Sequence, residues 1–293
     1  MRSVRRIIGI VAAVVATSVA SSAGSAPLNV IYGTDSNDTI VATSAADVIY
    51  AKSGDDRITN VGDGDVVWAS SGNDTISTLP GITASNVVIE ANVGHDKIEG
   101  ALQSSYVNGG SGNDSIKVNG CDNDVRGESG NDVYDNVALC PNDNTANLGN
   151  GHDKVLLHYA SSILLGNGND QLNAITSDYV HSSSGNDKLT MQDAVDGIVY
   201  LGTGHDEVTM PLAAGVTVFG SDGNDKVSVG SGANNVLHGQ SGNDTFTLES
   251  STGPNTLDGN QNRDKARLGS VSGTSCHLIE TIVDLAGAKR ACT

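Results

Sequence analysis

Bulky side chains and positive charges are scarce in this sequence of 293 residues. It contains one Trp, two Phe and 16 Lys plus Arg, against 34 Asp plus Glu, which gives a net charge of −18. So few aromatic residues exclude an ordinary large globular core, and the negative balance disfavours binding to nucleic acid or to anionic membrane surfaces. High charge with little core material is typical of disordered chains. An ordered fold must therefore draw its stability from another source.

Long apolar runs are missing after the N-terminus, where the chain begins with a targeting pattern. Three arginines precede or adjoin an apolar run from Ile7 to Ala20, which is too short to span a bilayer. We interpret residues 1–26 as a secretory signal peptide that is cleaved between Ala20 and Ala26, with a retained N-terminal anchor as the alternative. The mature protein is then expected to be secreted, either free or associated with the cell surface.

The sequence does contain a strict repeat. Aspartates recur about every 18 or 19 residues, each with an apolar or aromatic residue two positions later. Early in the chain, Asp38, Asp47 and Asp56 are nine residues apart, so one full turn comprises two units of nine residues. From Asp74 onward only one of the two units keeps a Gly two positions before its Asp. The aspartates of this regular unit are Asp38, Asp56, Asp74, Asp96, Asp114, Asp132, Asp153, Asp170, Asp187, Asp206, Asp225 and Asp244.

This repeat predicts a solenoid. Short β-branched and aliphatic runs, most of them four to five residues long, separate the turns, and no helical periodicity precedes the C-terminal tail. We therefore expect an all-β, right-handed parallel β-roll or β-solenoid of about thirteen two-strand turns over residues 27–268. Residues 269–293 lose the pattern and are predicted to cap the open end of the last turn.

Four cysteines in an exported chain predict two disulfides. Cys121 and Cys140 each lie three residues before an Asp of the less regular unit, so they occupy the same register in successive turns, about 4.8 Å apart. We pair Cys121 with Cys140. The remaining Cys276 and Cys292 would then tie down the tail.

The repeat resembles the Gly- and Asp-rich nonapeptide of RTX proteins, G-G-x-G-x-D-x-U-x, in which U is a large apolar residue. Residues 109–117 read G-G-S-G-N-D-S-I-K, a full match, and residues 239–247 are one Gly short of it. The resemblance spans about residues 33–268. It implies a calcium-binding β-roll in which each Ca²⁺ lies between one corner and the corner one full turn later, held by carboxylates and main-chain carbonyls.

The resemblance places the metal ligands at the corner of the regular unit, on the twelve aspartates named above and on the turn glycines, which let carbonyl oxygens face inward. Asp38 is included although its turn lacks the second Gly. The other corner has lost most of its Gly and Asp; Asp47, Asp65 and Asp124 are open candidates, but closure by Asn-type hydrogen bonds without metal is favoured. We expect one column of about ten ions, without which the chain is expanded. The turn glycines are Gly110, Gly112, Gly149, Gly151, Gly166, Gly168, Gly202, Gly204, Gly239 and Gly242.

Other polar residues are interpreted as solvated. Three His replace Asn before a ligand Asp and stand three turns apart, about 14 Å, too far to share one metal ion. Four Lys follow their Asp directly and form an outward stripe whose pairing with acids is worth little. These residues are His95, His152, His205, Lys97, Lys154, Lys188 and Lys226.

The predicted role is structural or binding rather than catalytic. The sequence has no G-x-S-x-G nucleophile elbow, no H-E-x-x-H helix and no phosphate-binding loop. Enzymes of the RTX family carry a separate catalytic domain beside the repeats, and no segment remains here for one. Expected partners are Ca²⁺ and a cell-surface component or polysaccharide, with no nucleic acid. Two alternatives stay open: an ice-binding or adhesive β-solenoid, and a β-helix enzyme that acts on polysaccharides.

Overall fold

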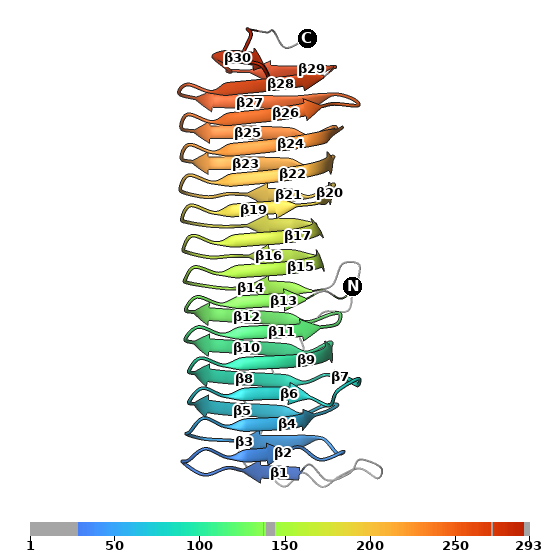
Figure 1. The fold of residues 1–293 in the computed structure, drawn as a ribbon, viewed down its shortest axis with the longest axis vertical. Helices are drawn as coiled ribbons and strands as arrows, with labels where there is room; N and C mark the ends of the chain where they lie inside the picture. Colours follow the sequence, from blue (N-terminus) through green and yellow to red (C-terminus); the bar gives the residue numbers. More distant parts are fainter. Residues whose placement is uncertain (1–28, 137, 139–143, 271, 290–293) are drawn as a thin grey trace.

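The computed structural model describes residues 29–136, 138, 144–270 and 272–289, which form one continuous coil of β-strands (Figure 1). The strands alternate between two parallel sheets, sheet A with 14 strands and sheet B with 16. The predicted all-β solenoid of about thirteen turns is confirmed. Within the described ranges, no helix is long and apolar enough to cross a membrane.

The strands have the following bounds. Those of sheet A are β1 (Asn29–Tyr32), β3 (Asp47–Tyr50), β5 (Val66–Ser71), β8 (Val88–Val93), β10 (Tyr106–Ser111), β12 (Asp124–Ser129), β14 (Thr145–Asn147), β16 (Ser162–Leu164), β18 (Tyr179–His181), β21 (Ile198–Tyr200), β23 (Thr217–Asp222), β25 (Val236–Ser241), β27 (Asn255–Gln261) and β29 (Thr274–His277). Those of sheet B are β2 (Thr39–Val41), β4 (Arg57–Val61), β6 (Thr75–Thr78), β7 (Thr83–Ser85), β9 (Lys97–Gln103), β11 (Ser115–Asn119), β13 (Val133–Asn136), β15 (Lys154–Ala160), β17 (Gln171–Ser177), β19 (Lys188–Met191), β20 (Asp193–Val195), β22 (Glu207–Ala214), β24 (Lys226–Ala233), β26 (Thr245–Ser250), β28 (Lys265–Ser270) and β30 (Thr281–Asp284).

The core is a narrow layer of aliphatic side chains between the two sheets. Along each strand every second side chain points inward, so the residue two positions after each corner Asp is buried, as at Ile58, Ile76 and Ile116. In-register pairing stacks equivalent residues on one another, for example Ile58 on Ile76. Each turn therefore buries its apolar residues against the neighbouring turns, which is how a sequence with few aromatic residues fills a core.

Most aromatic rings lie outside this core. Phe246 and Tyr134 are buried within it, whereas Tyr200 and Phe219 lie on the outer face of sheet A. Their ring centroids are 4.9 Å apart with an interplanar angle of 11°. Because these two rings occupy neighbouring rungs, their stacking ties one turn to the next.

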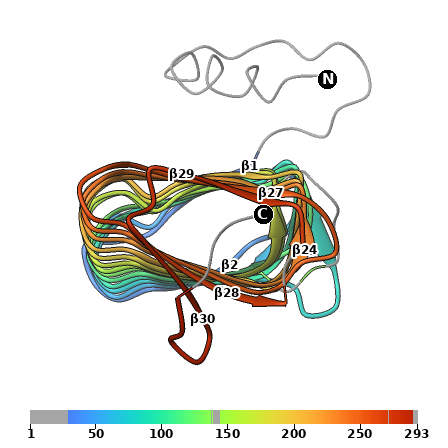
Figure 2. The ribbon, with the colours of Figure 1, turned by 90° about the horizontal axis from the view of Figure 1, so that it is seen from above.

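The two edges of the roll differ in regularity. We call the segments that lead from a strand of sheet A to the next strand of sheet B the acidic corner, and those that lead from sheet B to sheet A the opposite corner. The acidic corner forms the uniform left edge in Figure 1, and in Figure 2, along the axis, its turns are similar curves, each slightly displaced from the one before. The opposite corner varies in length and carries the extra strands β7 and β20, which pair with β9 and β22.

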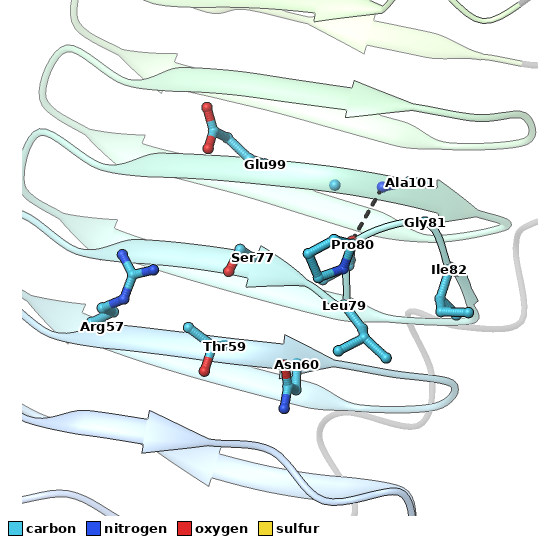
Figure 3. Close-up of a pocket in the computed structure, with 12 residues that line it drawn as sticks. Arg57, Thr59, Asn60, Ser77, Leu79, Pro80, Gly81, Ile82, Glu99 and Ala101 are labelled. Carbon is cyan, nitrogen blue, oxygen red and sulfur yellow. Dashed lines mark hydrogen bonds between the residues drawn. The ribbon is translucent and has the colours of Figure 1, made fainter.

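One of these extra segments covers a hollow on sheet B. Residues 79–82 rise over β4, β6 and β9 and enclose about 520 Å³, with Arg57 and Glu99 as the charged side chains of the lining (Figure 3). The Ala101 N–H donates to the Thr78 hydroxyl at 3.3 Å and holds the segment to β9.

The strands continue beyond residue 268, where the sequence predicted the start of a cap. β29 pairs with β27 and β30 pairs with β28, so the tail adds one more turn before a bridge between Val283 and Lys289. The predicted disulfides stay predictions because Cys140 and Cys292 lie outside the described residues. The predicted signal peptide, residues 1–26, also lies outside them.

Candidate metal centre

The acidic corner contains many glycines in backbone conformations that other residues rarely adopt. In the turn from β10 to β11, Gly110 and Gly112 have φ values of +102° and +130°, which L-residues rarely adopt. A Cβ on Gly112 would also overlap the carbonyl oxygen of Gly94 one turn earlier. The glycines therefore let successive turns approach closely, with main-chain oxygens facing the neighbouring turn.

The predicted glycines share this geometry, with one exception. Nine of the ten have positive φ; Gly239 does not. A Cβ on Gly239 would instead overlap Oδ2 of Asp244, so this glycine leaves space for a carboxylate rather than permitting a turn.

A column of buried aspartates runs along the acidic corner. From Asp56 to Asp244 each predicted aspartate is at most 2% exposed. One carboxylate oxygen, Oδ1, accepts a hydrogen bond from the main-chain N–H of the equivalent Asp one turn earlier, for example Asp153 to Asp170 at 2.8 Å and Asp170 to Asp187 at 2.8 Å. This contact recurs along the column and locks the turns in register.

The second carboxylate oxygen of each aspartate has no partner. Oδ2 is buried and makes no hydrogen bond at twelve successive corners. Leaving a buried carboxylate oxygen unsatisfied costs free energy at every turn, and a bound cation would remove this cost. The twelve are Asp56, Asp74, Asp96, Asp114, Asp132, Asp153, Asp170, Asp187, Asp206, Asp225, Asp244 and Asp264.

Burial raises the pKa of these carboxyl groups. The pKa of Asp96, Asp132 and Asp225 rises to about 7, mainly because desolvation disfavours the charged form. The hydrogen bond from the preceding Asp N–H acts in the opposite direction, and the negative charge of neighbouring corner aspartates raises the pKa further. The column is therefore a row of carboxylates that is poorly stabilised without positive charge.

The donor set fits a hard divalent cation. All candidate ligands are oxygens, which Ca²⁺ prefers, and thiolate or imidazole ligands are not part of the column. Nowhere in the described part of the chain do three or more His, Cys, Asp or Glu side chains converge on one point. Each ion would therefore depend on the carboxylates of two successive corners together with main-chain carbonyl oxygens.

Comparison with known proteins agrees with this chemistry. Residues 29–60, 61–81, 104–134 and 219–250 match the RTX calcium-binding nonapeptide repeat. These four matches and the parallel β-solenoid fit an RTX-type parallel β-roll protein. A solved structure described as a hyperactive, Ca²⁺-dependent, beta-helical antifreeze protein from an Antarctic bacterium aligns with 94% of this chain and 97% of its own chain, at a TM-score of 0.66 and 19% identity. At this identity the likeness concerns the fold alone. No curated protein matches the sequence significantly.

A second column of hydrogen bonds follows the outside of the acidic corner. The residue before each ligand Asp donates its main-chain N–H to the side chain of its equivalent one turn earlier. The His95 N–H donates to Asn73 Oδ1 at 2.8 Å, and the Asn113 N–H donates to His95 Nδ1 at 2.7 Å. His can replace Asn here because Nδ1 accepts the same bond as an amide oxygen. The three histidines are thus exposed turn residues, as the sequence indicated.

The opposite corner of the β-roll satisfies its own polar groups. Asn235 Oδ1 accepts the Val216 N–H at 3.1 Å, as a corner Asp would, but its Nδ2 donates to the Ala213 carbonyl at 2.9 Å. Asn123 donates in the same way to the Leu102 carbonyl at 2.8 Å. An amide N–H thus takes the place that a cation would fill at the acidic corner.

The aspartates of the opposite corner are also partnered. Asp47 Oδ2 accepts the Thr43 N–H at 2.6 Å, and Asp65 Oδ2 accepts the Gly62 N–H at 2.7 Å. Asp124 lies 3.3 Å from Arg126. These carboxylates have no unsatisfied buried oxygen among the described residues.

The ends of the column differ from the sequence-based prediction. Asp38 is half-buried, and its Oδ2 accepts the Thr34 N–H at 2.5 Å, so it does not share the geometry of the other eleven predicted aspartates. Asp264 does share it, being buried with an unpartnered Oδ2. Sequence reasoning missed Asp264 because it has Asn two positions before it and a small Ala two positions after it. Asp264 lies 20 residues after Asp244, about one full turn, and this spacing was the feature of the sequence that could have identified it.

Proposed function

We propose that this β-roll binds a column of Ca²⁺ ions along the acidic corner and that its folding depends on them. The observation that carries this proposal is the series of buried, unpartnered Oδ2 atoms from Asp56 to Asp264. Bound calcium would supply the positive charge that these oxygens lack. The corner aspartates, with the inward-facing carbonyls of the turn glycines, would hold about one ion between each pair of successive turns.

Without cations the folded chain is expected to be unstable. Neighbouring carboxylates one rung apart, about 4.8 Å, repel one another by roughly 3 kcal/mol at an effective dielectric constant near 20. The aliphatic core of each turn is thin, and repulsion repeated over many turns is comparable to the whole stability of a typical domain. Calcium binding and folding are therefore proposed to be one process.

The test combines stoichiometry with compaction. Calorimetric titration with CaCl₂ should show several bound ions, and far-UV circular dichroism with small-angle scattering should show a disordered, expanded chain in EDTA that becomes compact and β-rich in CaCl₂. MgCl₂ serves as the control, because Mg²⁺ demands a smaller and stricter octahedral site. A chain that remains compact and β-rich in excess EDTA would contradict the proposal.

We also propose that the folded roll acts outside the cell as a structural or binding rod rather than as an enzyme. The matched repeat family is a calcium-binding family, and weak calcium sites fill readily outside the cell, where calcium is abundant. N-terminal sequencing of protein collected from the culture medium tests this assignment. A mature N-terminus between residues 21 and 27 is expected, and retention of residues 1–20 in a cytoplasmic fraction would oppose it.

Ice binding is a second candidate, and the regular outer column at the acidic corner favours it. Asn73, Asn113 and Asn131 share one register position there, with His95 on the rung between the first two, and the calcium-dependent protein of similar fold is described as an antifreeze protein. His95, Asp55 and Val93 interrupt the surface and weaken the match. Thermal hysteresis in CaCl₂ solution would support this candidate, and its absence would remove it.

A further inference from the structure

The column of hydrogen bonds at the acidic corner does not stop at the last repeat. Each corner Asp N–H donates to the Asp of the next turn, as far as the Asp244 N–H to Asp264 Oδ1, but the turn after Asp264 has no Asp at the corner position. Its N–H donates instead to Glu280 Oε2 at 2.5 Å. Glu280 therefore takes the place that an aspartate holds elsewhere, although it lies in the tail beyond the recognisable repeats.

The tail reproduces the corner in a shortened form. β30 pairs with β28 so that Thr281 lies beside Lys265, which places Glu280 beside Asp264 in register. The Thr281 N–H donates to the Asp264 carbonyl at 3.1 Å, as the Lys265 N–H donates to the Asp244 carbonyl at 2.9 Å. The longer Glu side chain can reach the column from this shorter turn.

We propose that Asp264 and Glu280 form a terminal calcium site that fastens the C-terminal tail to the roll. Asp264 Oδ2 is buried and unpartnered, so it faces a position that lacks positive charge. The Glu280 carboxylate lies next to it and would add a second negative ligand. This inference rests on the proposed function, and it extends the metal column by one turn, to a residue outside the Gly-Asp motif.

The matched variants Glu280→Gln and Glu249→Gln test this site. Gln keeps an oxygen that can accept the Asp264 N–H but removes the charge, and Glu249 is an exposed Glu on β26 outside the column. Native mass spectrometry should find one calcium fewer in Glu280→Gln than in wild type or Glu249→Gln. Hydrogen exchange over residues 274–284 should be about tenfold faster in Glu280→Gln, with the rest of the roll unchanged.

The outcomes separate this inference from the proposed function. If wild type binds no calcium, both fail. If wild type binds several ions and Glu280→Gln binds the same number with an equally protected tail, only the terminal site is overturned.

A different observation concerns the outer face of sheet B, where the positive charges of this acidic protein collect. The first two outward positions of the fourteen strands on the main path of sheet B, which leaves out β7 and β20, carry eight Lys or Arg and three acidic residues, in a chain of net charge −18. The basic residues are Arg57, Lys97, Lys117, Lys154, Lys188, Lys226, Lys265 and Arg267; the acidic ones are Glu99, Asp135 and Glu207.

In the C-terminal half of this face the lysines are evenly spaced. The register places Lys154, Lys188, Lys226 and Lys265 on alternate rungs of one row, separated by Gln171, Glu207 and Thr245. Alternate rungs are about 10 Å apart. Lys188 lies 3.9 Å from Glu207 in an exposed pair, which is worth little. The parallel row beside the lysines carries hydroxyl and amide groups, namely Asn173, Thr190, Thr209, Ser228 and Thr247.

A hollow lies within this row. It encloses about 320 Å³ between Lys154 and Lys188 and is also lined by Leu156, Gln171 and Thr190. Two positive charges, an amide, a hydroxyl and an apolar patch thus surround one shallow space. This combination suits a sugar unit that carries a carboxylate.

We infer that this lysine row binds an extended acidic polysaccharide along the axis of the roll. A positive charge every 10 Å or so matches a polymer of sparse negative charge. Duplex DNA carries one charge per about 1.7 Å, far denser than the spacing of the lysines. The neighbouring hydroxyl and amide row offers hydrogen bonds to sugar hydroxyls. This inference names a surface for the polysaccharide partner and requires the folded, calcium-loaded roll.

The test uses hyaluronan, which has one carboxylate per disaccharide, with neutral dextran and duplex DNA as comparisons. Wild type in CaCl₂ should bind immobilised hyaluronan and not dextran. Lys154→Gln/Lys188→Gln/Lys226→Gln should weaken binding about tenfold, since each surface charge contact contributes a few tenths to 1 kcal/mol. The control Lys52→Gln/Arg263→Gln/Lys289→Gln changes the net charge equally, but all three residues lie outside the sheet B row.

Circular dichroism first establishes that both triple variants fold in CaCl₂, so a folding failure is recognised as such. Equal weakening by both triple variants, no binding of hyaluronan by the folded wild type, or tighter binding to DNA than to hyaluronan would each overturn the polysaccharide assignment.

Discussion

Replacing one interior corner aspartate by asparagine should change stability in opposite directions with and without calcium. Asp170 is buried, its Oδ1 accepts the Asp153 N–H at 2.8 Å, and its Oδ2 is unpartnered. In Asp170→Asn the amide oxygen can keep the bond to Asp153. The amide nitrogen would replace the unpartnered oxygen and could donate to a carbonyl, as Asn235 does at the opposite corner.

The magnitude follows from the neighbours. Without calcium, Asp170 is repelled by Asp153 and Asp187, by up to about 3 kcal/mol each at 4.8 Å and an effective dielectric constant near 20. Partial protonation reduces this repulsion, because burial raises the pKa of Asp170. We therefore expect Asp170→Asn to stabilise the calcium-free roll by about 2 kcal/mol. With calcium, the same substitution removes a charged ligand from the two sites that flank Asp170, and we expect a loss of about 3 kcal/mol.

The assay is urea unfolding followed by far-UV circular dichroism at slightly alkaline pH, in EDTA and in excess CaCl₂. If the wild type is already disordered in EDTA, the stabilisation appears as more β-structure in the variant before urea is added. Asp178→Asn, an exposed aspartate at the opposite corner, is the matched control and should change little in either condition. Equal destabilisation of Asp170→Asn in both conditions would refute the reasoning, because it would mean that the carboxylate stabilises the folded chain even when no cation is bound.

Three further predictions follow from the same geometry. Burial raises the pKa of Asp96, Asp153 and Asp187 to about 7, above the unfolded value near 4, so between these values the folded chain binds more protons than the unfolded chain. The contribution of these groups to the stability of the calcium-free roll should therefore be greatest below pH 4 to 5 and should fall as the pH rises toward 7. Circular dichroism in EDTA at a series of pH values would measure this. Gly223→Ala should lower the free energy of unfolding by well over 2 kcal/mol, because Gly223 has φ +146° and a Cβ there would overlap the Gly204 carbonyl. Gly81→Ala should lower it by about 1 kcal/mol, because Gly81 has φ +78° but nothing within 4 Å of its Cβ position. Similar losses in thermal or urea unfolding would mean that the turns are not closely packed. Asn235→Asp should destabilise the protein by about 2 kcal/mol in urea unfolding without calcium, because it replaces the amide bonded to the Ala213 carbonyl by a buried charge; an unchanged midpoint would show that this corner accommodates a carboxylate unaided.

Sequence periodicity was sufficient for the architecture of this protein. The spacing of 18 to 19 residues, the Gly before each Asp and the apolar residue after it predicted the strand order, the in-register stacking and the burial of residues such as Ile76 and Ile116. Such patterns are readable because each turn contacts only its two neighbours, so a local repeat in the chain becomes the same repeat in space.

The C-terminal end of the aspartate column could not be predicted from the repeat. Asp264 lacks the turn Gly, and Glu280 belongs to a shortened turn without the motif, yet register brings both to the acidic corner. The lysine row was predicted in part, because the sequence placed Lys154, Lys188 and Lys226 on an outward stripe, but only the register added Lys265 and the hydroxyl and amide row beside it. Net charge counts residues without regard to position, so a strongly negative total concealed a basic face on sheet B.

By itself, the sequence determined that the chain coils into a β-roll with one regular acidic corner, because turn chemistry and strand alternation are local properties. Only the tertiary structure decided which carboxylate oxygens are satisfied and which are left without a partner. Oδ1 of Asp170 meets an N–H from the preceding turn whereas its Oδ2 meets none, and Asn235 closes its own corner with an amide. The physical reason is that hydrogen bonding and burial depend on residues one turn away, 17 to 22 positions distant in the sequence, and no single repeat contains that information.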